Sequence, residues 1–320
     1  MKSMIVLILL CIASIAYGDN SQKSRQLFPV EVDGKYGYID KAGQIVIAPK
    51  FDYASDFIEG LAEIRIGSPE SGLFGYIDIG GKIVIKPKYQ SAGTFSDGVA
   101  IVRDNKGLVI IDKKGKNLLR LELDMAELGF SEGLAAKALV FKDKVGVFYG
   151  FIDKTGKVII LPKYRFARNF SEGLAAVRED KGRKVGKDGY IDKNAQWIIA
   201  PQYDRATDFH DGLAAVFVGK VGEEKCGYID KKGAWVLPAT FRHCGDFSEG
   251  LASVALEGFT GFINPKGEIV IAPQFLNAKK FSGGLAEVEA PTDDEFKVLR
   301  GYINKSGKYV WGPKTYRWEP

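Results

Sequence analysis

A motif that recurs along nearly the whole chain constrains the fold more than any other feature. The stretch GYIDKAGQIVIAPKFD begins at Gly37, and variants such as GFIDKTGKVIILPKYR return later. Eight copies can be aligned, and they open at Gly37, Gly75, Val109, Gly150, Gly189, Gly227, Gly261 and Gly301. The openings are 34 to 41 residues apart, which is the range of small repeat units that stack on one another. The repeat therefore predicts one domain built from eight similar units.

A second motif, most often written FSEGLA, follows seven of the copies. It opens at Phe57, Phe95, Phe130, Phe170, Phe209, Phe247 and Phe281. The distance from the first motif to this Phe is 20 or 21 residues, whereas the connection from the second motif to the next copy varies from 10 to 16 residues. Equivalent connections of a stacked repeat emerge on one side, and variable loops carry binding sites. We therefore expect binding on the side of these variable connections.

Each unit is predicted to hold three antiparallel β-strands. The first carries Gly-aromatic-Ile-Asp, the second the Ile/Val run, as in residues 45–47, and the third Leu-Ala-x-Val, as in residues 174–177. The Ile/Val run is apolar at successive positions, which predicts a strand covered on both faces. The segment from Pro-x-aromatic to the Phe lacks alternation, so we expect a loop with a short helical turn. In the third copy, residues 117–130 lack the Pro and are rich in helix formers, which allows a longer helix.

The two ends of the chain favour a closed ring. Residues 27–32 resemble a third strand placed ahead of the first copy, and the last copy stops after its second strand at Pro313. The chain then divides into eight three-stranded units, each opening with the third strand. We predict an all-β, closed, propeller-like ring, with an open curved β-repeat array as the alternative.

The acid in each first motif is predicted to build a turn. Asp40-Lys41-Ala42-Gly43 has the residue order of a type I turn, in which the Asp side chain accepts backbone N–H groups ahead of it and the Gly adopts a left-handed conformation. The acid is replaced by Asn264 and Asn304 in the last two copies. Asn retains the turn-forming oxygen but cannot serve as a charged ligand or general base. A structural role explains these replacements, whereas a catalytic or metal-binding role does not.

The acids of the second motif allow two interpretations. They are Glu59, Asp97, Glu132, Glu172, Asp211 and Glu249, with Gly283 in the last occurrence. Stacked units could align them into an acidic strip, so a calcium-dependent structural module is one alternative. Calcium requires several oxygen ligands at one point, and one acid per unit supplies few. We favour a solvated turn residue beside a flexible Gly, and predict no metal or cofactor.

The first 18 residues resemble a secretory signal peptide. Lys2 provides a positive start, residues 5–15 are apolar but too short to span a bilayer, and Ala16-Tyr17-Gly18 offers a cleavage site. We expect cleavage after Gly18, with an uncleaved anchor as the alternative, leaving residues 19–320 as a single exported domain without a transmembrane segment. The protein would be periplasmic, secreted or at the cell surface. A net charge of +5 is too weak to indicate nucleic-acid binding.

Two cysteines remain after the predicted signal, Cys226 and Cys244. Because an exported protein rarely retains free thiols, a Cys226–Cys244 disulfide is plausible. Two buried, inert thiols are the alternative. A zinc site that includes His243 is disfavoured, because the spacing matches no familiar ligand pattern.

Two groups of side chains are candidates for binding. Trp197 and Trp235 share one register in neighbouring units and could stack on a sugar or a peptide, although Ile or Val at this register elsewhere favours core packing. A basic run in one variable connection could contact an anionic partner, or could simply be solvated. Its members are Lys181, Arg183, Lys184 and Lys187.

No catalytic constellation is evident. His210 and His243 belong to no Ser or Cys nucleophile motif, and no Gly-rich phosphate loop follows a strand. An extracellular polymer hydrolase or lyase is kept as an alternative, because a site assembled across repeats leaves little sequence trace. Its acids would come from variable connections, and the candidates are Asp180, Asp188, Asp293 and Asp294.

The motifs resemble the WG-repeat family, also called KWG repeats, of mostly bacterial proteins. The resemblance rests on Gly-Tyr-Ile-Asp-Lys-x-Gly, Ile/Val-x-Pro-x-Tyr/Phe and Phe-Ser-Glu-Gly-Leu-Ala, and it covers nearly the whole mature chain. The Trp that precedes the Gly in the family is replaced here by Tyr36, Phe74, Tyr149, Asp188, Cys226, Thr260 or Arg300. The resemblance implies a β-rich binding or scaffolding array with no shared ligand or catalytic residues. We therefore expect a monomeric, non-catalytic scaffold that binds a protein or cell-envelope glycan through the variable connections.

Overall fold

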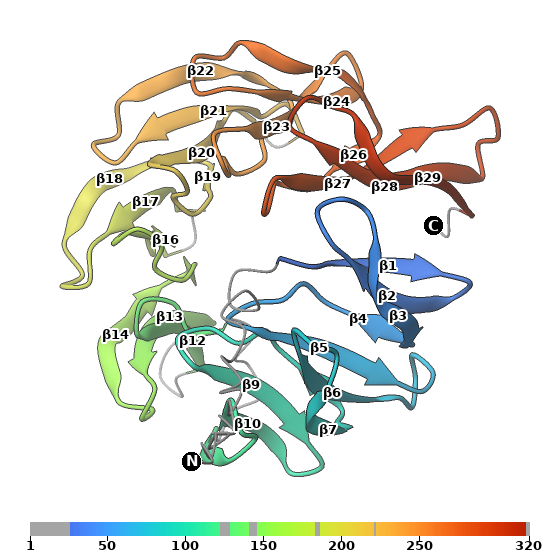
Figure 1. Ribbon diagram of the computed structural model, residues 1–320. Helices are drawn as coiled ribbons and strands as arrows, with labels where there is room; N and C mark the ends of the chain where they lie inside the picture. The colour runs from blue at the N-terminus through green and yellow to red at the C-terminus, as the bar shows by residue number, and fades with distance from the viewer. Residues whose placement is uncertain (1–25, 122–128, 141–145, 183–185, 221, 318–320) are drawn as a thin grey trace, which may run out of the picture.

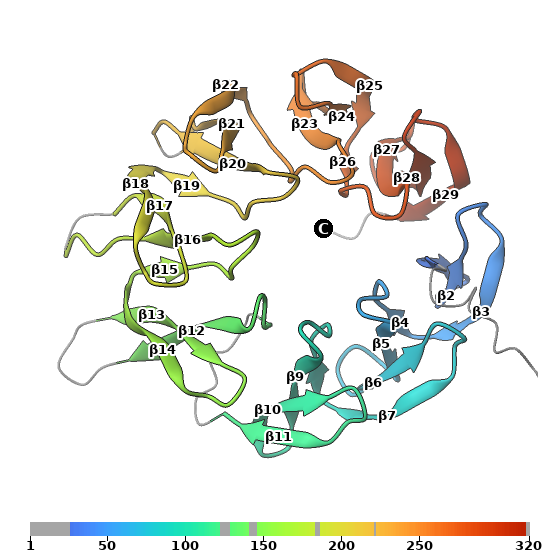
Figure 2. The same ribbon diagram turned by 60° about the vertical axis from the view of Figure 1, so that its left-hand side comes forward.

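The computed structural model describes residues 26–121, 129–140, 146–182, 186–220 and 222–317. These residues form eight small antiparallel β-sheets in a ring and contain no helix (Figures 1 and 2). Each sheet is a blade made of strands that are consecutive in sequence, so the molecule is an eight-bladed β-propeller. The predicted signal peptide, residues 1–18, lies outside the described residues.

The strands are numbered in chain order. Blade 1 contains β1 (Phe28–Val32), β2 (Lys35–Ile39) and β3 (Ile45–Phe51), and blade 2 contains β4 (Tyr53–Ala54), β5 (Leu61–Ile66), β6 (Leu73–Asp78) and β7 (Ile83–Tyr89). Blade 3 contains β8 (Ser91–Ala92), β9 (Val99–Asp104), β10 (Gly107–Asp112) and β11 (Asn117–Arg120), and blade 4 contains β12 (Leu134–Val140), β13 (Val147–Asp153) and β14 (Val158–Tyr164). Blade 5 contains β15 (Phe166–Ala167), β16 (Ala175–Arg178), β17 (Asp188–Ile191) and β18 (Trp197–Tyr203), and blade 6 contains β19 (Arg205–Ala206), β20 (Leu213–Val218), β21 (Lys225–Asp230) and β22 (Trp235–Phe241). Blade 7 contains β23 (Ala252–Leu256), β24 (Phe259–Ile263) and β25 (Ile269–Phe275), and blade 8 contains β26 (Asn277–Ala278), β27 (Leu285–Pro291), β28 (Lys297–Asn304) and β29 (Tyr309–Arg317).

Five blades hold four strands, which corrects the prediction of three. The extra strands β4, β8, β15, β19 and β26 have two residues each and pair with the Leu-Ala strand. They lie in the segment for which a helical turn was predicted. Pairing with the Leu-Ala strand satisfies the backbone hydrogen-bonding groups of these short strands. Two residues are too few to show the alternation of apolar and polar residues from which a strand is predicted. In the third copy, residues 117–120 form a strand, and residues 122–128 of the allowed helix lie outside the described residues.

The Ile/Val strand lies at the outer edge of each blade and is not covered on both faces, contrary to the prediction (Figure 2). In β3, Ile45 is 54% exposed and only Ile47 of the run is buried. The strand continues through Pro49 to Phe51. Proline has no N–H to donate and is confined to edge strands, where it discourages pairing with another chain. The Pro therefore protects the rim of the ring in seven of the eight blades, whereas β11, the outer strand of blade 3, has none.

The predicted Asp turn is confirmed. Asp40 Oδ1 accepts the N–H groups of Ala42 at 2.9 Å and Gln44 at 3.0 Å, and Gly43 has φ +79°. The same pair of bonds is made by the other Asp residues and by Asn264 and Asn304. An uncharged amide thus replaces the acid without changing the turn, as the structural interpretation requires.

One turn offers a test of backbone strain. Ala195 occupies the left-handed position with φ +60°, where the other copies have Gly. A Cβ in this region costs about 1 kcal/mol, partly offset by the greater freedom of Gly in the unfolded chain. We expect Ala195→Gly to stabilise the protein by about 0.5 kcal/mol in urea unfolding. The matched change Gly233→Ala, at φ +83°, should destabilise it, and equal signs for the two variants would contradict the assignment.

The acids of the second motif link neighbouring blades rather than pointing only into solvent, which corrects the favoured interpretation. Glu59 and Gly60 both have positive φ, forming the type I′ turn between β4 and β5. The Glu59 carboxylate accepts the N–H of Gly98 in the next blade at 2.9 Å and pairs with Lys113 at 3.0 Å. The acid-to-glycine bond recurs for Asp97, Glu132, Glu172, Asp211 and Glu249. The acids are thus inter-blade fasteners.

Aromatic side chains build the interfaces between blades. The Tyr38 ring lies 4.7 Å from that of Phe57, and its hydroxyl donates to the Ser55 carbonyl oxygen of blade 2 at 2.7 Å. The same ring pair recurs at 4.7–4.8 Å in blades 2, 4, 5, 6 and 7. The Phe of the second motif is therefore a core anchor, as the repeat suggested.

The ring is closed, and the open array is excluded. Blades 1 and 8 lie side by side in both views (Figures 1 and 2). Tyr302 donates to the carbonyl oxygen of Pro29 at 2.9 Å, and Tyr316 donates to that of Glu31 at 2.9 Å. Phe28 packs against Tyr302 with ring centroids 5.5 Å apart. Since no sheet of the described chain mixes strands from both ends, side-chain packing and hydrogen bonds close the ring.

Candidate functional site

The interface between blades 8 and 1, here called the seam, departs from the repeat. The acid of the second motif is replaced by Gly283, and the Gln26 side chain fills the space above it while donating to Ser282 at 2.9 Å. As in blades 4 and 7, the described part of the blade 1 sheet has no two-residue strand before its first long strand, β1. A cavity of about 460 Å³ lies here, lined by residues of blades 8, 1, 2 and 3. We call it the seam pocket.

Aromatic rings form much of the wall of the seam pocket. They belong to Tyr36, Tyr53, Tyr302, Trp311 and Tyr316. Tyr302 is buried, whereas Tyr53 is 37% exposed. The Tyr36 and Tyr53 ring centroids are 6.0 Å apart. Burial raises the pKa of Tyr316 to about 12 and that of Tyr53 above its ordinary value. The rings therefore remain neutral. Because the Tyr302 and Tyr316 hydroxyls already donate to backbone carbonyl oxygens, the wall offers a ligand mainly apolar ring faces.

The charged groups of the seam pocket are partly paired. Glu287 pairs with Lys279 at 2.6 Å, and Glu289 accepts two bonds from Arg300 at 2.9 and 3.1 Å. Burial alone would lower the pKa of Lys279, but the Glu287 carboxylate reverses this and raises it. These four residues form three ion pairs across the strands of blade 8, since Arg300 also lies 3.6 Å from Glu287.

Two further carboxylates, Glu31 and Asp56, line the pocket without an ion pair among the described residues. The surrounding wall desolvates the Asp56 carboxylate and raises its pKa, although the residue as a whole remains exposed. Glu31 lies beside Tyr36 and, after burial, is the next cause that raises the pKa of that hydroxyl. The pocket thus has an excess of negative charge in a chain whose net charge is +5.

The mouth of the pocket lies near the variable connections. Glu289 faces Arg300 across the β27–β28 hairpin, whose connection spans residues 292–296, and Glu31 faces Tyr36 across the β1–β2 hairpin. Successive strands run antiparallel, so these hairpins leave the ring on the same face in every blade. The predicted binding side and the seam pocket therefore adjoin.

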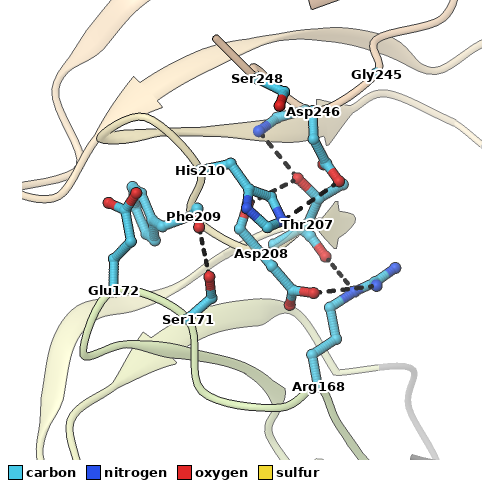
Figure 3. A network of polar contacts seen from close by, with 12 residues as sticks. Arg168, Ser171, Glu172, Thr207, Asp208, Phe209, His210, Gly245, Asp246 and Ser248 are labelled. Atoms are coloured by element: carbon cyan, nitrogen blue, oxygen red, sulfur yellow. Dashed lines mark hydrogen bonds and ion pairs between the residues drawn. The ribbon is translucent and has the colours of Figure 1, made fainter. Parts of the chain in front are cut away.

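A second polar cluster lies on the inner wall between blades 5, 6 and 7 (Figure 3). The Arg168 guanidinium lies 3.9 Å from Asp208, and His210 Nε2 lies 3.5 Å from the Asp246 carboxylate. Asp208 Oδ1 is buried and has no hydrogen-bond partner in the described structure. Burial raises the pKa of Asp208. The cluster joins three blades through side-chain contacts.

A buried acid between blades 2 and 3 predicts a pH-dependent stability. Burial raises the pKa of Glu63 from 4.5 to about 7, and the residue is only 6% exposed. The folded state therefore favours the neutral acid, so this contribution to stability is complete below about pH 4.5 and is lost as pH rises through about 7. We expect Glu63→Gln to stabilise the protein by about 1–2 kcal/mol at pH 8 and hardly at all at pH 4.5. Urea unfolding at both pH values measures this. Glu268→Gln, at an exposed turn, is the control, and an equal effect at both pH values would contradict the shift.

The described binding residues nominated from the sequence lie in the neighbouring blades 5 and 6. Lys181 pairs with Glu179 at 3.2 Å and Lys187 with Asp204, while Arg183 and Lys184 lie outside the described residues. Trp197 and Trp235 are 40% and 45% exposed on the outer rim, so the core interpretation of these two residues is wrong. Each packs edge-on against a Tyr of the preceding blade.

The predicted disulfide is confirmed, since Cys226 and Cys244 are bonded with a Cα–Cα separation of 6.1 Å. Although both cysteines belong to one sequence repeat, the bond joins two blades. Cys226 lies in β21 of blade 6, and Cys244 bridges to Val254 in β23 of blade 7.

The acids nominated for hydrolysis do not converge. Asp180 pairs with Arg165 at 2.7 Å and Asp188 with Arg178 at 2.6 Å in blade 5, whereas Asp294 pairs with Lys297 at 2.6 Å and Asp293 is its neighbour in blade 8. Within the described ranges no group of three or more His, Cys, Asp or Glu residues could hold a metal ion. No helix in these ranges is long and apolar enough to cross a membrane. The hydrolase and calcium alternatives therefore gain no support.

The sequence analysis missed the seam pocket because its residues come from both ends of the chain. One signal was available. The second residue after the Leu of the second motif is Ala in blades 4 to 6 but Glu63 in blade 2 and Glu287 in blade 8, and in blade 8 Arg300 also occupies the position of the family's Trp. A residue that differs from its equivalents in the other copies need not make the packing contact that those equivalents make.

A family model described as "WG containing repeat" matches residues 36–68, 74–107, 149–182, 189–220, 227–258 and 261–289. The chain belongs to the WG-repeat family. Each matched segment runs from the middle strand of one blade into the next blade, and the copies that open at Val109 and Gly301 lie in none of them. A comparison with curated proteins finds no match.

Solved structures similar to this WG-repeat protein share its fold. Acylaminoacyl peptidase of Pyrococcus horikoshii is 13% identical with a TM-score of 0.53, and the match covers 82% of this chain and 52% of that one. The chain thus spans about half the length of that peptidase. The β-propeller domain of the Trilobed protease from Pyrococcus furiosus is 15% identical with a TM-score of 0.51, and the match covers 84% and 98% of the two chains. At these identities the likeness concerns the propeller alone.

Proposed function

We propose that this WG-repeat propeller is an exported, non-catalytic binding scaffold, and that the seam pocket is its ligand site. The observation that carries the proposal is a cavity of about 460 Å³ at the interface between blades 8 and 1, where Gly283 stands in place of the second-motif acid. Its volume is in the range of small-ligand sites, and it combines aromatic faces with a few converging polar groups. A partner protein or an envelope glycan can present a group of this size.

The proposal moves the site from the variable connections to the pocket beside them. Lys181 and Lys187 already pair with carboxylates, whereas Glu31 and Asp56 have no ion pair among the described residues. The acids nominated for hydrolysis lie in blades 5 and 8, and three of them are engaged in ion pairs, which favours a binding role over polymer hydrolysis. Export is inferred from residues 1–18 and is consistent with the Cys226–Cys244 disulfide.

Paired capture tests the proposal. Residues 19–320 are immobilised and exposed to envelope and secreted fractions of the source organism, beside a pocket variant, Tyr53→Ser with Asp56→Asn, and a rim variant, Trp197→Ser with Trp235→Ser. We expect a component that binds the wild type and the rim variant but not the pocket variant. Each retained component is then purified and titrated against the three proteins by calorimetry.

Two results would overturn the proposal. Equal affinity for the wild type and the pocket variant would place the site elsewhere. Retention of nothing by the wild type, combined with turnover of envelope polymers by the purified chain, would replace the scaffold by an enzyme. Circular dichroism verifies that the variants are folded.

A further inference from the structure

The charges of the seam pocket leave two carboxylates for a ligand. Lys279 and Arg300 are engaged by Glu287 and Glu289 of their own blade. Glu31 and Asp56 come from blades 1 and 2, on the other side of the seam, and line the same cavity. A carboxylate in a partly desolvated wall is stabilised by a cation that brings its own charge. Among the described residues neither Glu31 nor Asp56 has an ion-pair partner, so we expect the ligand that complements them to be cationic.

Aromatic rings beside these carboxylates specify the kind of cation. Tyr36 and Tyr53 line the pocket with Glu31 and Asp56, and a cation over a Tyr or Trp face gains cation–π attraction. The protein already uses this contact at the edge of the seam, where Lys314 Nζ lies 4.8 Å from the Trp311 ring centroid and the Arg300 guanidinium 4.8 Å from that of Tyr316. An apolar stem that ends in a cation matches these walls.

We propose that the seam pocket receives the side chain of a lysine presented by a partner protein, with its ammonium group between the carboxylates of Glu31 and Asp56 and its alkyl stem along the rings of Tyr36 and Tyr53. This inference rests on the proposed function and names the partner as a protein. An ammonium suits this position better than a bidentate guanidinium, because Glu31 and Asp56 come from different blades and the guanidinium fork matches the two oxygens of a single carboxylate. A neutral sugar would leave both carboxylates without a counter-charge.

The test uses the indole N–H resonance of Trp311, which lines the pocket and is assigned by its loss in Trp311→Phe. Three probes are titrated into residues 19–320: Nα-acetyl-lysine methylamide, Nα-acetyl-norleucine methylamide and chitobiose. We expect a saturable shift with the lysine probe only, at millimolar dissociation constants. We expect this affinity to fall at least tenfold in Asp56→Asn and in Glu31→Gln. Glu223→Gln, at an exposed position in blade 6, should match the wild type.

The outcomes separate this inference from the proposed function. If chitobiose saturates the shift and lysine does not, the pocket binds a ligand but the lysine assignment is wrong. If norleucine binds as tightly as lysine, or if Asp56→Asn and Glu31→Gln retain wild-type lysine affinity, the carboxylates do not hold an ammonium and the inference fails. If no probe shifts Trp311 and capture shows a pocket-dependent partner, the scaffold stands without the lysine. A one-dimensional spectrum of each variant verifies folding.

Discussion

Replacing Gly75 by alanine is expected to destabilise the protein by about 3 kcal/mol, the largest effect of any single methyl group we foresee. A Cβ at this position would lie 2.4 Å from the Ile85 carbonyl oxygen, 2.6 Å from the Pro87 nitrogen and 2.9 Å from the Lys86 carbonyl carbon. All three atoms belong to the backbone of β7, so no side chain can rotate away. The steric clash is relieved only if β7 moves away from β6 at the point where the register of the two strands shifts. Urea unfolding of the variant measures the loss.

Two controls isolate the close approach of the strands. Gly129→Ala adds the same methyl group where no atom lies within 4 Å and φ is not positive, so its effect should remain within about 0.5 kcal/mol. The third copy, where Val109 replaces the Gly and the Pro is absent, shows that the Gly and the Pro are needed together. There β10 and β11 pair in ordinary register from Val109 to Ile110. A Gly75→Ala protein as stable as Gly129→Ala would refute this account.

Loss of the Cys226–Cys244 disulfide is expected to cost about 3 kcal/mol. The bond closes a loop of 18 residues and ties β21 of blade 6 to the inner segment of blade 7. Its main effect is to restrict the unfolded chain, and it also holds two blades at the position where the family has Trp. Urea unfolding of the wild type with and without a phosphine reductant, beside the double variant Cys226→Ala/Cys244→Ala, measures the contribution.

The double variant also serves as the control for the reductant. It should unfold at the same urea concentration with and without the phosphine, whereas the wild type should shift to a lower concentration when reduced. If the reduced wild type matched the oxidised protein, with free thiols verified by mass spectrometry, the bond would contribute nothing measurable.

Much of the fold was predictable because interactions between residues close in sequence determine the turns and strands of each repeat. The turn at Asp40 needs only an oxygen acceptor and a left-handed Gly, both set by neighbouring residues, and Asn264 identified it as structural. The constant spacing between the motifs, with the strand-like segments at both ends, indicated eight units and favoured the ring that Tyr302 and Pro29 close. The sequence also contains a lysine pattern. In most copies a Lys follows the turn Asp or Asn, and several of these Lys residues pair with a second-motif acid of an earlier repeat, as Lys113 pairs with Glu59.

The sequence by itself determined the units, their number and their turns, because these depend on contacts within about 20 residues. Only the tertiary structure decided which faces are covered. The run at Ile45 looks buried by composition, yet it lies at the outer edge because no further strand pairs with it. The seam pocket is decided at still longer range, since Tyr36 and Asp56 meet Glu287 and Arg300 only after eight blades have closed into a ring. Local patterns do not carry such contacts, because the repeat is nearly the same in every blade and the pocket forms where the last blade meets the first.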